Sequence, residues 1–176
     1  MPIRFKFAAQ KASAAIHWMT AQQHDLDLHA ALKAFYFADK SHLREWRRPI
    51  FGATYRAMRF GPVPLEIYEM MKGEALWKAE LGAEKFPWEI SGYRLRRIAN
   101  SQPDLDVFSD SEVEHLSRGL EKSLSMTFNE RTEATHGPDW QKAELGLMRY
   151  EDMLEDSPHK AETIAYLEAN GRYMRL

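Results

Sequence analysis

Cysteine is absent from the 176-residue sequence, and this absence excludes several kinds of chemistry. Without cysteine there is no disulfide bond, no thiolate metal ligand and no cysteine nucleophile. No apolar run approaches the roughly 18 residues that a membrane-spanning helix needs. Lysine, glutamine and histidine interrupt the alanine-rich N-terminal stretch, so it does not resemble the apolar region of a signal peptide. We therefore expect a cytoplasmic protein with no membrane partner.

Familiar catalytic motifs are lacking as well. The sequence contains no Gly-rich phosphate loop, no HExxH, no GxSxG and no zinc-finger spacing. We therefore expect no enzymatic activity and no cofactor. Asp39 and His42 share one face of a predicted helix and could bind a metal ion, with His136 as a third ligand. We favour a structural role instead, in which Arg48 or backbone donors near Pro49 hold Asp39, and His42 makes ordinary hydrogen bonds.

The composition is that of an ordinary globular protein. Hydrophobic residues make up 44% and charged residues 28% of the chain, so a disordered chain is excluded. The length suits one domain, and no repeat or Gly/Ser-rich linker divides the sequence. We therefore predict a single domain over residues 1–176.

Charge is distributed unevenly along the chain. Residues 1–100 contain 16 Lys and Arg against 10 Asp and Glu, whereas residues 101–176 contain 8 against 16. The most basic segment, Lys40–Phe60, contains one acidic residue and five arginines: Arg44, Arg47, Arg48, Arg56 and Arg59. Such a segment could attract an acidic partner or a phosphate backbone. It could equally pack against the acidic part of its own chain.

Hydrophobic periodicity predicts a mainly helical fold. Five helices are expected: one through Phe5–Met19, one from Asp27 to a stop at Pro49, one carrying Val63, Ile67, Met70 and Trp77, one capped by Ser109 and Glu112, and one from Ser157-Pro158 to Asn170-Gly171. Strand-forming runs occur at Thr54–Phe60, Trp88–Ile90 and Tyr93–Leu95. The last two are predicted to form a hairpin with its turn at Ser91-Gly92, and Thr54–Phe60 could join them in one sheet. The predicted architecture is a helical bundle with a small antiparallel sheet of about three short strands.

The segment Leu28–Pro64 resembles the SocA-like antitoxin family, also called the Panacea domain and often labelled phage-associated. That family has a K-L-L-Y-x-A-D helix, then H-L, G-R-P-I, a Y-x-A strand and Y-G-P-V. The residues that match these motifs are Lys33, Phe35, Tyr36, Ala38, Asp39, His42, Leu43, Arg48, Pro49, Ile50, Tyr55, Ala57, Gly61, Pro62 and Val63. A later family element, T/S-H-x-x-x-W, matches Thr135, His136 and Trp140. Arg47 and Phe60 replace the usual glycine and tyrosine of the family.

The resemblance implies an antitoxin that neutralises a cognate toxin by direct protein contact. Some members of the family also deliver their toxin to an ATP-dependent protease of the ClpXP type. The family has no catalytic activity. We therefore expect a toxin protein as the main partner and a ClpXP-type protease as a second one.

Two regions offer the aromatic and arginine side chains that dominate binding energy at protein interfaces. One is the corner that contains Arg44, Trp46, Arg47, Arg56 and Arg59, and the other contains His136 and Trp140. Trp140 could point outward to a partner or pack inward as an anchor. The same basic corner suggests the alternative function, a nucleic-acid-binding accessory protein, although the sequence pI of about 6.4 argues against it.

Overall fold

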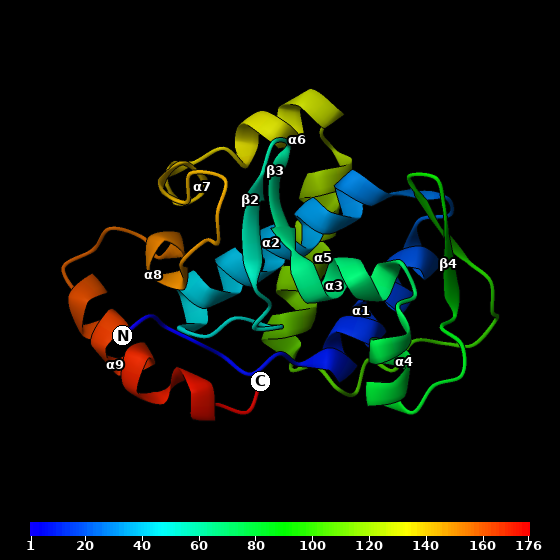
Figure 1. Cartoon of the computed structure of the whole chain (residues 1–176), viewed down its shortest axis with the longest axis horizontal. Helices are drawn as coiled ribbons and strands as arrows, with labels where there is room; N and C mark the ends of the chain where they lie inside the picture. The colour runs from blue at the N-terminus through cyan, green and yellow to red at the C-terminus, as the bar shows by residue number, and fades with distance from the viewer.

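The fold is built around one long central helix, α2 (Leu28–Trp46), in a computed structural model that describes all 176 residues (Figure 1). The helix begins at Leu28 because the Asp27 side chain accepts a hydrogen bond of 2.9 Å from the backbone N–H of Ala30. It ends where Arg47 adopts a left-handed conformation, with φ 54°. The sequence predicted this central helix, and the prediction is confirmed. Arg47 thus adopts the conformation that glycine favours, at a cost of about 1–2 kcal/mol.

Shorter helices surround α2 (Figure 1). They are α1 (Ala9–Gln22), α3 (Leu65–Met71), α4 (Ala75–Leu81), α5 (Asp110–Leu124), α6 (Phe128–Ala134), α7 (Pro138–Lys142), α8 (Tyr150–Met153), α9 (Lys160–Asn170) and the 3-10 turn η1 (Gly171–Tyr173). The predicted capping box of α5 is present, with Ser109 and Glu112 bonded reciprocally. No helix is both long enough and apolar enough to cross a bilayer. The prediction of a mainly helical fold is confirmed.

The strands form two small antiparallel sheets rather than one. β1 (Leu26–Asp27), β5 (Arg94–Arg97) and β4 (Trp88–Ser91) make the first sheet, and β2 (Tyr55–Met58) with β3 (Gly61–Pro64) makes the second. The sequence predicted that the strand after Thr54 would join the hairpin near Trp88, and this was wrong. Gly61, with φ 107°, lets the chain reverse immediately after β2, so this strand pairs with the residues that follow it.

Three predicted helix boundaries were also wrong. The first helix starts at Ala9, so Phe5 lies before it. The predicted third helix is divided into α3 and α4 by a turn at Gly73 (φ 75°), and Val63 belongs to β3 instead. Ser157 and Pro158 form a turn, in which the Ser157 carbonyl accepts a hydrogen bond from Lys160, and α9 begins at Lys160.

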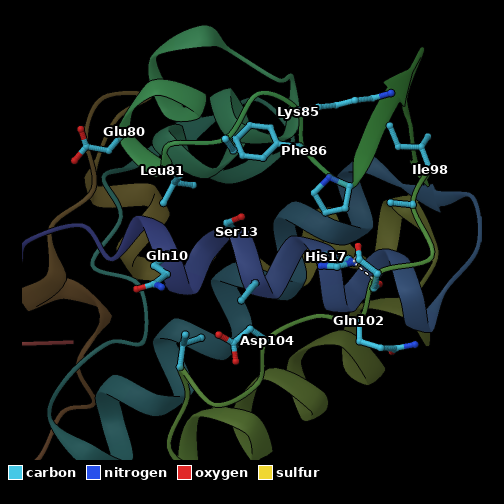
Figure 2. Close-up of a pocket in the computed structure, with 16 residues that line it drawn as sticks. Gln10, Ser13, His17, Glu80, Leu81, Lys85, Phe86, Ile98, Gln102 and Asp104 are labelled. Carbon is cyan, nitrogen blue, oxygen red and sulfur yellow. Dashed lines mark hydrogen bonds between the residues drawn. The ribbon is translucent and has the colours of Figure 1, made fainter.

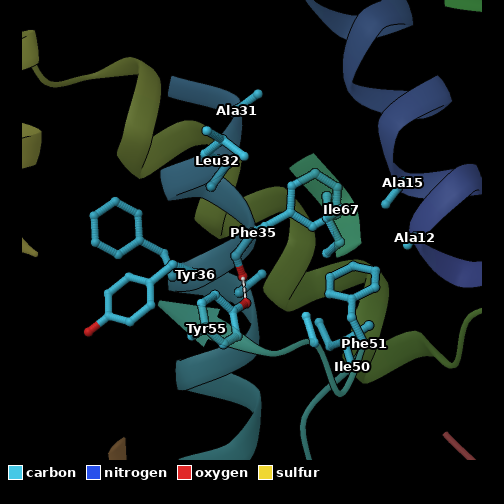
Figure 3. Packing of buried hydrophobic residues seen from close by; sticks show 14 of the residues in the cluster. Ala12, Ala15, Ala31, Leu32, Phe35, Tyr36, Ile50, Phe51, Tyr55 and Ile67 are labelled. Carbon is cyan, nitrogen blue, oxygen red and sulfur yellow. Dashed lines mark hydrogen bonds between the residues drawn. The ribbon is translucent and has the colours of Figure 1, made fainter. Parts of the chain in front are cut away.

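One continuous hydrophobic cluster of 34 buried residues fills the space between α2 and its neighbours. Figure 3 shows Phe35 of α2 packed among Phe51, Tyr55 and Ile67, with Ala12 and Ala15 of α1 on the far side. The rings of Phe35 and Phe51 lie 4.9 Å apart, edge to face. This core fixes α2 relative to α1, α3 and β2.

We predict that Gly119→Ala destabilises the protein, although alanine is the better helix former. A Cβ at Gly119 would lie 2.8 Å from the Ala34 carbonyl oxygen and 3.0 Å from the Ala38 nitrogen, both in the α2 backbone. The substitution therefore forces α5 away from α2, and we expect a net loss of about 1–2 kcal/mol in the free energy of unfolding. Urea unfolding measures it.

Ser117→Ala is the matched control, because Ser117 lies on the exposed face of α5. It should leave stability unchanged or raise it by up to about 0.5 kcal/mol. If Gly119→Ala stabilises the protein as the control does, the close packing of α5 on α2 is wrong.

Candidate functional site

Asp39, predicted to be structural, is completely buried and binds the chain that follows α2. Its Oδ1 accepts hydrogen bonds from the backbone N–H groups of Ile50 (2.7 Å) and Phe51 (3.0 Å), and its Oδ2 accepts one from the Tyr55 hydroxyl (2.9 Å). Burial raises the pKa of this carboxyl to about 6, while the three hydrogen bonds oppose the increase. Backbone donors near Pro49 therefore hold Asp39, which was one of the two predicted arrangements.

His42, the second residue of the hypothetical metal site, is also engaged in hydrogen bonds within the protein. Its Nδ1 lies 2.7 Å from the Arg48 carbonyl oxygen and its Nε2 lies 2.9 Å from the Ser111 hydroxyl. Both ring nitrogens are therefore used to join α2 to the Pro49 turn and to α5. His136, the third residue of the hypothetical metal site, stacks on Trp140 instead.

Several basic residues of the first half of the chain pair with acidic residues of the second half. Arg48 and Lys11 both contact Glu112, at 2.6 and 2.7 Å. Lys40 contacts Asp139 at 3.0 Å. Arg44 donates to the Met153 carbonyl oxygen at 2.8 Å and lies 3.5 Å from Glu155. Internal pairing therefore accounts for much of the uneven charge in the sequence.

The predicted arginine corner does not form one surface. Arg44, Trp46 and Arg47 lie at the C-terminal end of α2, whereas Arg59 lies at the tip of the β2–β3 hairpin, beside the N-terminal end of α2 (Figure 1). The 19 residues of α2 span about 27 Å at about 1.5 Å per residue. The sequence could not show this separation, because the hairpin runs back along α2.

The His136 and Trp140 region is joined to the hairpin. Their rings stack at 3.7 Å between centroids, and the Trp140 indole N–H donates to the Met58 carbonyl oxygen at 2.9 Å. Trp140 is therefore an anchor that packs inward, one of the two predicted orientations. Arg56 lies on the exposed side of β2.

A cavity of about 780 Å³ lies between α1, α4 and the chain around residues 85–104 (Figure 2). His17 lines it, with Nε2 at 2.9 Å from the Ser101 carbonyl oxygen, and burial lowers the pKa of this histidine. Glu80 and Lys85 lie at opposite sides of the opening in Figure 2. Its charged groups therefore do not converge on one ligand position.

A second cavity, of about 530 Å³, contains an unexpected serine, histidine and carboxylate set. Ser41 Oγ lies 2.7 Å from His115 Nδ1, and His115 Nε2 lies 3.0 Å from a Glu45 carboxylate oxygen. Ser41 also donates to the Ala38 carbonyl oxygen within α2. Because the neighbouring backbone N–H groups are used inside the helix, they cannot stabilise an oxyanion at Ser41. No backbone N–H group is therefore free to form an oxyanion hole beside Ser41.

The most apolar opening, which we call the hairpin groove, has a volume of about 650 Å³. It lies between the N-terminal half of α2, the β2–β3 hairpin, α3, the start of α6 and the β4–β5 turn. Its lining residues are Asp27, Leu28, His29, Leu32, Lys33, Met58, Arg59, Phe60, Gly61, Val63, Tyr68, Tyr93 and Phe128. Sequence reasoning found only Arg59 of these as a binding residue. The sequence signals that pointed to this groove were the matched motif residues Lys33, Gly61 and Val63 and the replacement of the usual tyrosine of the family by Phe60.

Lys33 is a buried cation in the lining of the hairpin groove, with 1% of its surface exposed. Its Nζ donates to the Pro62 carbonyl oxygen at 2.8 Å, and burial lowers its pKa to about 7. Only glycine leaves room for this side chain at position 61, because a Cβ there would lie 2.7 Å from Lys33 Cε. Two matched motif residues, Lys33 and Gly61, are therefore packed against each other.

The low pKa of Lys33 predicts a pH-dependent effect of Lys33→Met. Between about pH 7 and pH 10 the unfolded chain binds a proton that the folded Lys33 does not, so wild-type stability from this group rises with pH. As the pH falls from about 10 to about 7, this stability is progressively lost, and below about pH 7 both states carry the proton and the contribution no longer changes. Lys33→Met should therefore gain stability relative to wild type as the pH falls from about 10 to about 7, and the difference should level off below that. Chemical unfolding at several pH values measures this difference, with Lys6→Met, which removes an exposed lysine, as control. A difference that does not change with pH would contradict the prediction.

A comparison with family models finds one match, described as Antitoxin SocA-like, Panacea domain, over residues 32–141. The matched segment contains more than half of the 176 residues, including the hairpin, α5 and α6. It also contains the motif residues from Lys33 to Trp140. No curated protein and no solved structure matches the chain. The chain belongs to the SocA-like antitoxin family and contains its Panacea domain.

Proposed function

We propose that the protein is an antitoxin that neutralises a cognate toxin by binding it directly. The observation that carries this proposal is the family match over residues 32–141. The surface supports it, because exposed aromatic side chains and Arg59, which has no carboxylate partner, line the hairpin groove. Aromatic and arginine side chains contribute most of the energy at protein interfaces.

Action by binding rather than by catalysis is the second part of the proposal. Asp39, His42 and Glu112 are engaged in hydrogen bonds that join structural elements. The Ser41 and His115 pair has no backbone donors for an oxyanion. These observations support a role in which neutralisation depends on contact, with no substrate turnover and no cofactor.

Delivery to a protease is a second mode that the family resemblance suggests. A direct inhibitor leaves the amount of toxin unchanged, whereas an adaptor to a ClpXP-type protease shortens the lifetime of the toxin. The half-life of the toxin, measured with and without the antitoxin in cells with and without the protease, separates the two modes.

We predict that the purified protein retains the product of an adjacent toxin gene. Tagged antitoxin is co-expressed with the neighbouring open reading frame, and the retained protein is identified after affinity purification. The neighbouring product should also arrest growth when expressed alone and should be harmless with the antitoxin. If the neighbouring product is not retained, the proposal fails.

We predict no specific nucleic-acid binding at physiological salt. Arg44 and Arg48 are paired internally, and the free Arg47 and Arg59 lie near opposite ends of α2. Fluorescence anisotropy with labelled DNA and RNA at increasing salt measures the affinity. Binding that falls steeply with salt, as counterion release requires, would instead favour the alternative function.

A further inference from the structure

The hairpin groove exposes an unusual number of large apolar side chains on different elements. Met58 and Phe60 of the hairpin are 41% and 46% exposed, Phe128 of α6 is 42% exposed and Tyr93 of the β4–β5 turn is 81% exposed. Together with the buried floor formed by Leu28 and Val63, they make one contiguous apolar opening. Contiguous apolar surface of this kind marks binding sites in soluble proteins.

The walls of the groove are fixed before any partner binds. Arg131 can only donate, so its Nε–H bonds to His29 Nδ1 (3.1 Å), and His29 must carry its proton on Nε2. That nitrogen donates to the Phe60 carbonyl oxygen at 3.0 Å. Burial lowers the pKa of His29 to about 4, so this neutral form persists. Phe60 also contacts the Phe128 ring edge to face, at 5.1 Å.

The groove carries an excess of positive charge. Its one carboxylate, Asp27, caps α2 and lies 3.5 Å from Arg131. Lys33 has only a carbonyl oxygen as its partner, and Arg59 lies over the Phe60 ring without a carboxylate. Exposed Arg59, together with Lys33 when it is protonated, therefore favours an anionic group on a ligand, and the low effective dielectric constant around buried Lys33 strengthens its part of the attraction.

We propose that the hairpin groove receives a segment of the toxin that inserts an aromatic or aliphatic side chain and places an adjacent carboxylate near Arg59 and Lys33. This inference rests on the proposed antitoxin function and names the surface that performs it. Apolar shape selects the inserted side chain, and the two cations select the acidic residue beside it. The C-terminal end of α2, with Trp46 and Arg47, is then outside the interface.

The test uses the purified antitoxin and the toxin encoded next to it. Phe60→Ala with Phe128→Ala removes the apolar walls, and Arg59→Glu reverses the charge at the rim. We expect each to raise the dissociation constant about ten-fold or more, which corresponds to about 1.4 kcal/mol. Tyr173→Ala and Arg172→Glu are matched controls, because both side chains are exposed on η1, away from the groove. Thermal unfolding shows that each variant is folded.

The outcomes separate the inference from the proposed function. If wild type binds the toxin and the groove variants bind equally well, or if only Arg47→Glu weakens binding, the groove assignment is wrong and the antitoxin function stands. If wild type binds no neighbouring product, both fail. Light scattering of the protein alone is a further test, since a dimer that Phe60→Ala disperses would show a second copy in the groove and overturn the inference.

Measuring affinity at several pH values tests whether a carboxylate of the toxin binds near Lys33. The other titratable groups that face Lys33 are Asp27, His29, Arg59, Tyr68, Tyr93 and Arg131. Of these, His29 stays neutral because burial lowers its pKa to about 4. A toxin carboxylate favours protonated Lys33 and raises its pKa in the complex, so affinity should increase as the pH falls toward about 7 and change little just below it. The same increase should be smaller in Lys33→Met. Affinity that does not depend on pH, or depends on it equally in the variant, would overturn the role of Lys33.

Discussion

The buried carboxylate of Asp39 accepts hydrogen bonds from the Ile50 and Phe51 backbone and from the Tyr55 hydroxyl, and the rest of the structure depends on these bonds. Two of these bonds satisfy the backbone N–H groups of Ile50 and Phe51. These groups need a side-chain acceptor because the chain between α2 and β2 forms no regular secondary structure there. An apolar residue at position 39 would leave these donors unpaired in the interior, at a cost of about 1–3 kcal/mol each. Burial and hydrogen bonding thus direct the chain back along α2.

The path of this returning chain decides where the functional surface forms. Tyr55 begins β2 at the middle of α2, so the hairpin tip reaches the N-terminal end of the helix, where Phe60 meets His29. Lys33 and Gly61 are then in close contact, and the groove opens between the hairpin, α6 and the β4–β5 turn. A structural hydrogen-bond set at the middle of α2 therefore positions the proposed binding surface at the N-terminal end of the helix.

Charge has two separate roles in this protein. Pairs such as Arg48 with Glu112 and Lys40 with Asp139 join segments distant in the sequence, and they are partly shielded from water. Such pairs depend on both partners, since removing one leaves a buried charge. Lys33 and Arg59 have no carboxylate partner and line the groove instead. Internal pairing thus leaves positive charge unbalanced at the surface that we assign to the toxin.

Features that depend on residues close together in the chain could be predicted from the sequence: the central helix from Asp27, the capping box of Ser109 with Glu112, the mainly helical class and the family. Local hydrogen bonds and side-chain periodicity decide these. The sequence did not determine that Thr54–Phe60 pairs with its own continuation, that the arginines divide between two ends of α2, or that Phe60, Tyr93 and Phe128 share a groove. These features appear only in the folded chain, because they depend on which distant segments the core brings together.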